Sequence, residues 1–176
     1  MKKAFTMIEL IFVIVILGIL ASVAIPRLAG TRTDAEISAT VANIRTLVSD
    51  AASYYAVKGE FAGAKWRDIT NVPIRLSNKN LVKDKHPVTD DVYLTTGGEN
   101  CILVRLRDKG ATTPVAFIQI AKVLQNVNIP ICKDVLAAAP IKAYLDAKVP
   151  GIAPLGSTTG TRPGVIAIGS NLTIHQ

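Results

Sequence analysis

One apolar block limits the folds open to this chain more than anything else in its sequence. It runs from Phe5 to Ile25 and holds a single charged side chain, Glu9. As a helix, these 21 residues would span about 31 Å, which matches the roughly 30 Å hydrocarbon core of a bilayer. Lys2 and Lys3 precede the block and Arg27 follows it, and a basic N-terminus favours keeping that end in the cytoplasm. The sequence therefore predicts one membrane-spanning helix, with the rest of the chain outside the cytoplasm.

Two ordinary roles for this block leave Glu9 unexplained. A secretory signal peptide would be cut after the small-x-small run Ser22-Val-Ala24, but such peptides have a clean apolar region. A plain anchor has the right length, yet a carboxylate at the centre of a membrane helix costs about 2.5–3.5 kcal/mol. That cost is offset if a cation meets the carboxylate in the same low-dielectric layer. A carboxylate that reaches the lipid headgroups is the simpler alternative.

The start of the chain has a recognisable pattern. Residues Ala4-Phe5-Thr6-Met7-Ile8-Glu9-Leu10 resemble the prepilin motif, whose usual form is Gly-Phe-Thr-Leu-Ile-Glu. The resemblance covers Lys2 to Pro26 and indicates a type IV pilin or a type II secretion pseudopilin. It implies that a prepilin peptidase cuts between Ala4 and Phe5 and N-methylates Phe5. It also implies that Glu9 neutralises the N-terminal amine of a neighbouring subunit. Ala4 stands where glycine is usual, which bears on the rate of cleavage.

The resemblance also implies a domain plan, a location and a set of partners. We expect a leader at 1–4, a transmembrane and polymerisation helix at 5–26, an amphipathic helix at 27–59 and a periplasmic sheet domain at 60–176. The subunit would first be a single-pass inner-membrane protein and then part of a periplasmic or surface filament. Its partners would be the peptidase, identical or related subunits, an inner-membrane assembly platform and, before assembly, membrane lipid.

The helix is predicted to continue beyond the membrane. Pro26 lacks an N–H group and predicts a kink. Beyond it, apolar residues recur at helical spacing, which predicts one buried stripe that ends near Gly59. The stripe consists of Ile37, Val41, Ile44, Val48, Ala52 and Tyr55.

The remaining chain predicts an antiparallel sheet and therefore an α+β fold. Strand-like runs occupy 92–96, 101–106 and 115–121, and a terminal hairpin could join 165–168 to 172–174. Residues 134–147 are weakly helical and interrupted by Pro140. We expect the sheet to lie on the amphipathic part of the long helix.

Whether the two cysteines, Cys101 and Cys132, form a disulfide depends on whether this part of the chain lies outside the cytoplasm. In an oxidising compartment an even pair predicts a disulfide, which would stabilise the fold by about 3–4 kcal/mol. The alternative is two buried free thiols.

The chain offers little that suggests catalysis. His86 and His175 fit no metal-ligand pattern, and we expect no enzyme, metal or cofactor. The chain has a net charge of +7, and its stretch from Lys58 to Lys85 holds seven basic and three acidic residues together with Phe61. Basic residues beside aromatic ones can bind nucleic acid, so a DNA-binding minor pilin is an alternative to a solvated face. The candidate patch consists of Lys58, Lys65, Trp66, Arg67, Arg75, Lys79, Lys83 and Lys85.

Overall fold

The computed structural model describes residues 6–82, 86–110, 113, 115–149 and 163–168, with the backbone alone at 25–29 and 31. The chain divides into two compact units, Met1–Glu36 and Ile37–Gln176. The boundary falls within the first helix, α1 (Met7–Lys58), whose two parts are therefore described separately. The predicted domain bounds stay predictions.

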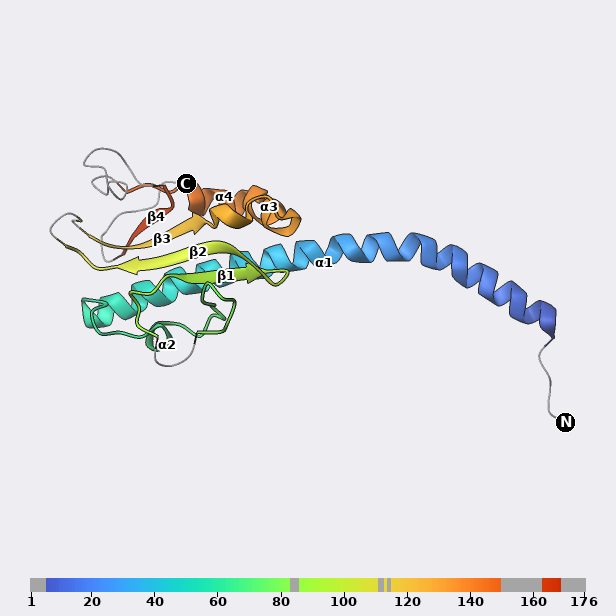
Figure 1. Cartoon of the computed structure of the whole chain (residues 1–176), viewed down its shortest axis with the longest axis horizontal. Coiled ribbons are helices and arrows are strands. Elements are labelled where there is room, and N and C mark those ends of the chain that lie inside the picture. Colours follow the sequence, from blue (N-terminus) through green and yellow to red (C-terminus); the bar gives the residue numbers. More distant parts are fainter. Residues whose placement is uncertain (1–5, 83–85, 111–112, 114, 150–162, 169–176) are drawn as a thin grey trace. The chain divides into compact units, whose positions relative to one another are not determined.

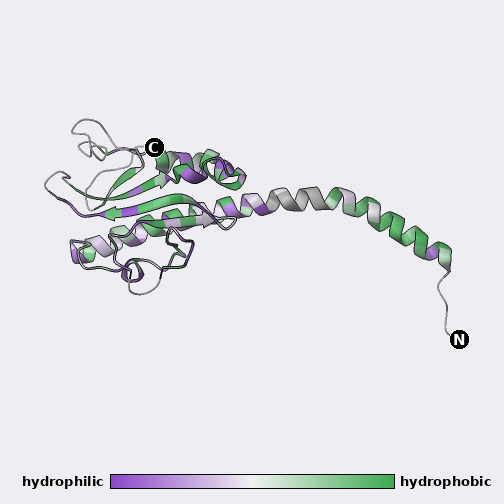
Figure 2. Cartoon of the chain, viewed as in Figure 1, coloured by the Kyte–Doolittle hydropathy of each residue, from purple (hydrophilic) through white to green (hydrophobic). Residues whose placement is uncertain are grey.

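The first unit consists of the apolar part of α1. Residues Met7–Ala24 have a mean hydropathy of 2.8, and none of them is buried. Figure 2 shows hydrophobic residues along this part of the helix. A helix that is apolar on all sides needs an apolar environment around it, and this one is long enough to cross a membrane. The kink expected at Pro26 stays a prediction.

The second unit contains the amphipathic part of α1. Its buried apolar side chains are Val41, Ile44, Leu47 and Ala51, which recur every three or four residues and form one face. The predicted stripe was wrong at Ala52, which is exposed, because the buried face drifts by one position and takes Leu47 and Ala51 instead.

The predicted end of α1 is confirmed. The helix ends at Lys58, and Gly59 has a φ of 76°. Its N–H group donates to the carbonyl of Tyr55 at 2.8 Å. Glycine takes up this left-handed conformation at little steric cost, which is why it closes many helices.

Within the described residues, four antiparallel strands form one sheet in the order β1-β2-β3-β4 (Figure 1). They are β1 (Val92–Thr96), β2 (Glu99–Arg107), β3 (Ala116–Lys122) and β4 (Val165–Ile168). The first three are the predicted meander: the bounds of β1 are as predicted, and those of β2 and β3 differ by one or two residues. In the described part of the chain β4 pairs with β3, whereas the expected partner at 172–174 lies outside the described residues.

Short helices connect and cover the strands. They are α2 (Trp66–Ile69), the 3-10 turn η1 (Leu124–Asn126), α3 (Pro130–Ala137) and α4 (Ala139–Asp146). The predicted interruption by Pro140 is confirmed: α3 ends before Ala138, whose ψ is 128°, and a new helix begins next to it. Pro140 lies in the first turn of α4, where its missing N–H group has no helical partner to lose.

One hydrophobic core joins the helix to the sheet. Ile44 and Leu47 of α1 share a cluster with Leu94, Ile102 and Ile118 of the strands. The predicted α+β architecture is thereby confirmed. A second, smaller hydrophobic cluster contains Phe117 of β3, Val165 of β4 and Val149.

A disulfide joins Cys101 of β2 to Cys132 of α3, with their Cα atoms 5.1 Å apart. Both residues are almost wholly buried. The predicted disulfide is confirmed, and the alternative of two free thiols was wrong.

Candidate assembly site and the predicted surface residues

Thr6 and Glu9 form a compact polar pair at the start of α1. Thr6 directly precedes the first helical residue, Met7. The backbone N–H of Thr6 donates to Glu9 Oε2 at 3.0 Å, and the Thr6 hydroxyl donates to the same oxygen at 2.8 Å. The N–H of Glu9 donates back to Thr6 Oγ1 at 3.4 Å. This reciprocal arrangement is a capping box, which satisfies N–H groups that a helix start leaves unpaired.

The surroundings of this pair are apolar. Glu9 is the only ionisable side chain between Met7 and Ala24, and its neighbours Ile8 and Leu10 are exposed. In lipid, an unsatisfied polar group costs several kcal/mol. The capping box therefore lets a carboxylate and a helix start satisfy each other next to a hydrocarbon layer.

The other predicted residues of this region are only partly placed. Ala4 and Phe5, the predicted cleavage and methylation site, lie outside the described residues. Pro26 lies within α1, and its predicted kink is untested. Among the N-terminal site residues, the structure thus places Glu9 and adds Thr6 as its partner.

The aromatic members of the predicted nucleic-acid patch are not exposed. The Trp66 side chain is fully buried, and its indole N–H donates to the carbonyl of Asp90 at 3.1 Å. Phe61 is also buried and lies against the rings of Tyr54 and Tyr55. Binding by stacking requires an exposed ring face for the base. Neither ring provides one here.

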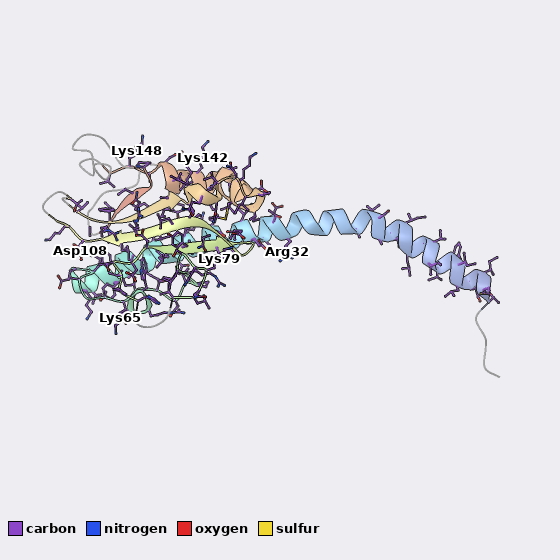
Figure 3. All side chains as sticks on the ribbon, viewed as in Figure 1. Arg32, Lys65, Lys79, Asp108, Lys142 and Lys148 are labelled. Carbon is purple, nitrogen blue, oxygen red and sulfur yellow. A yellow bond between two sulfur atoms is a disulfide. The ribbon has the colours of Figure 1, made fainter. Side chains whose placement is uncertain are left out.

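Among the described basic members of that patch, Arg75 and Lys79 lie together, whereas Lys65 lies apart from Lys79 (Figure 3). Lys79 donates to Glu99 at 2.8 Å, and Arg75 donates to the carbonyl of Lys79. Lys83 and Lys85 lie outside the described residues. Nucleic-acid binding by this stretch stays a prediction.

A charged cluster that no sequence pattern predicted lies beside the sheet. Arg105 of β2 and its neighbour Arg107 both pair with Asp91. The hydrogen bond from Arg105 lowers the pKa of Asp91, against a smaller opposing effect of burial, and the charges of both arginines add to the lowering. The same hydrogen bond raises the pKa of Arg105. Strand alternation places Arg105 and Arg107 on one face, but only the fold brings Asp91 to them.

A shallow groove of about 680 Å³ lies next to this cluster. It includes Tyr93, Leu103 and Arg105 of the two neighbouring strands and Leu124 of η1. Leu124 is 80% exposed. In the described part of the chain, no group of three or more His, Cys, Asp or Glu side chains could hold a metal ion.

Comparison with known proteins identifies only the N-terminal segment. Residues 1–25 match the family model described as the prokaryotic N-terminal methylation motif. No curated protein and no solved structure matches the chain. The match covers the segment that contains Thr6 and Glu9, which belongs to the first unit.

Proposed function

Because residues 1–25 carry the prepilin-type motif of type IV pilins and pseudopilins, we propose that this protein is a subunit of a type IV pilus-like filament. It is cut between Ala4 and Phe5 and N-methylated on Phe5. It waits in the inner membrane with its second unit in the periplasm, and then polymerises through α1. The motif points to a structural subunit and not to an enzyme.

The observation that carries this proposal is the exposure of the apolar helix. No residue between Met7 and Ala24 is buried within the chain, although their mean hydropathy is 2.8. Water cannot be the final environment of such a helix. Lipid satisfies it before assembly, and the equivalent helices of other subunits satisfy it in the filament.

Glu9 fixes the axial position of each of these helices relative to its neighbours. A carboxylate in an apolar layer is stable only when a cation lies beside it. The new N-terminal ammonium on Phe5 of a neighbouring subunit is such a cation. A subunit that packs at the wrong height leaves both charges unpaired, so the pairing favours one axial position.

The second unit suits a location outside the cytoplasm. Disulfides persist in oxidising compartments such as the periplasm, and this unit contains the Cys101–Cys132 disulfide. The basic N-terminus supports the same orientation. The disulfide lies outside the matched segment and is independent of the motif.

A pseudopilin of a type II secretion system is the alternative within the same class, because the motif is common to both groups. Such a subunit would form a short periplasmic filament that serves protein export. The DNA-binding role gains no support from the buried positions of Trp66 and Phe61.

Exchange of Glu9 for glutamine tests the proposal in the native cell. We expect Glu9→Gln to be cleaved and to accumulate in the inner membrane, but to give no sheared filaments. Glu36→Gln is a matched control, because Glu36 lies outside the apolar span and pairs with the exposed side chain of Arg32. Filaments at the wild-type level from Glu9→Gln would refute the role of the charge.

A further inference from the structure

We propose that the second units of neighbouring subunits bind each other head to tail, with the Leu124 side chain of one copy in a hollow beside Val57 of the next. This inference rests on the proposed filament function and extends it from the apolar helix to the second unit. Both surfaces belong to the same chain, so every copy offers one of each.

The projecting surface is the turn that follows β3. Leu124 of η1 is 80% exposed, and Lys122, the last residue of β3, is exposed near it. None of the ion pairs among the described residues includes the Lys122 amine. The side-chain amide of Asn126 donates to the carbonyl of Asn100 at 2.8 Å and fixes the turn to β2. A turn that is fixed in this way does not have to be ordered on binding.

The receiving surface is a hollow of about 410 Å³ between the last turns of α1 and the short helix α2. Val57 lines it and is 81% exposed, and the half-buried ring of Tyr54 lines it as well. Among the described residues of the second unit, the large apolar side chains that are exposed are Val57, Leu81 and Leu124. A contact between Leu124 and Val57 removes two of these three from water, which favours association.

The charges of the two surfaces are complementary. The hollow contains the carboxylates of Asp50 and Asp68 and one amine, that of Lys58. One oxygen of each carboxylate accepts a hydrogen bond within the chain, which fixes the side chain and leaves the second oxygen for a cation. The exposed amine of Lys122 supplies that cation from the next copy. Such a pair at the rim of an apolar contact selects the partner and its orientation more than it adds affinity.

The two surfaces lie at different heights along α1. The hydroxyl groups of Thr40 and Thr96 are 2.8 Å apart, so the turn between β1 and β2 lies beside Thr40. The turn that carries Leu124 is bonded to Asn100, close to the same end of β2. The hollow instead lies at residues 50–58 of α1, which is roughly 20 Å farther along the helix at 1.5 Å per residue.

The two surfaces also lie on different sides of the sheet. Leu124 borders the groove that includes Tyr93 and Leu103. These two strand residues alternate with Leu94 and Ile102, which share the core with α1, so they point away from α1. The hollow is formed by α1 and α2 themselves. A contact between two different surfaces at different heights shifts each copy along the axis, so it continues as an open filament and does not close into a ring.

Exchange of exposed residues tests each surface without disturbing the core. We expect Leu124→Ser to lower the amount of sheared filament per cleaved subunit about tenfold, as the return of an apolar side chain to water predicts. Lys122→Glu should lower it about fivefold, since a partly exposed ion pair becomes a contact of like charges. Leu81→Ser is the matched control, because Leu81 is exposed but lies in neither surface. A wild-type amount for Leu124→Ser, or an equal loss for Leu81→Ser, would overturn the inference.

A cross-link identifies what occupies the hollow. Val57→Cys and Leu124→Cys are produced in the same cells on separate copies of the full chain, and the sheared filaments are oxidised. We expect a disulfide-linked dimer whose peptides join the two substituted positions, while the native disulfide is buried and does not exchange. Val57→Cys with Leu81→Cys should give no dimer. An equal yield from that control pair, or a link from Leu124→Cys to a different protein, would overturn the inference.

The wild-type chain separates this inference from the proposed function. If it is processed at Phe5 and gives filaments, but the filaments of Val57→Cys and Leu124→Cys yield no dimer, only the head-to-tail contact is refuted. If the wild-type chain is not processed and gives no filament, the proposed function and the contact are both refuted.

Discussion

Arg105 of β2 donates from Nε to Asp91 Oδ1 at 2.7 Å and from Nη2 to the second oxygen of the same carboxylate. The two residues are 14 positions apart in the sequence, and the pairing of β1 with β2 brings them together. Such a two-point contact fixes the guanidinium and carboxylate planes relative to each other. This contact therefore forms only when β1 and β2 pair in the observed register.

Removal of this ion pair should weaken the second unit in a pH-dependent way. We expect Asp91→Asn to lower the free energy of unfolding by about 1 kcal/mol at neutral pH, since the pair is partly exposed. Trp66, the only tryptophan, is buried and provides a fluorescence signal for denaturant unfolding in detergent.

The pH dependence follows from the lowered pKa of Asp91. The contribution of a carboxyl group with a lowered pKa is complete above its unfolded value, here 3.8, and is lost as the pH falls through the folded value. The difference between wild type and Asp91→Asn should therefore shrink below pH 3.8. Asp134→Asn, an exposed exchange on α3, is the control. A difference that grew on acidification would contradict the account.

The disulfide should be a main source of stability for the second unit. It closes a loop with a sequence separation of 31, and the chain-entropy model predicts a contribution of about 3–4 kcal/mol. We expect the double variant Cys101→Ala/Cys132→Ala to lose about that much in denaturant unfolding. Reduced wild-type protein should behave like the double variant. A loss of unfolding free energy below about 1 kcal/mol would contradict this prediction and would show that the reduced chain keeps most of its order.

Gly164 should tolerate no side chain, because β4 approaches β3 closely at this residue. An added Cβ would lie 1.9 Å from the carbonyl oxygen of Ile120, and the φ of Gly164 is 72°. Gly63 has a similar φ of 74° but open space around it. We expect Gly63→Ala to cost about 1–2 kcal/mol from backbone conformation alone, and Gly164→Ala to cost clearly more. If denaturant unfolding showed the same loss of stability for both variants, β4 would not approach β3 as closely as in this structure.

Local patterns allowed much of this structure to be predicted. The apolar run after Phe5, the stop at Gly59 and the three strands of the meander depend on neighbouring residues, and the sequence contains these directly. The shift of the buried stripe from Ala52 to Ala51 and Leu47 depends on which side of α1 the sheet covers. No single helix sequence determines that choice.

Other features depend on contacts between distant residues. The pairing of β4 with β3, the contact of Asp91 with Arg105 and the burial of Trp66 all follow from tertiary packing. Thr6 is a different case, because a threonine three residues before a glutamate is a known signal for a capping box. In the sequence, Thr6 and Glu9 stand out first as parts of the prepilin motif.

The most direct test of the proposed function is the mass of the N-terminal peptide of the protein isolated from membranes. The account predicts that the mature chain starts at Phe5 and carries one added methyl group on its amine. A chain that starts at Ile25 would indicate an ordinary secreted protein, and an uncut chain that starts at Met1 would indicate a plain membrane anchor. Either result would contradict the filament proposal.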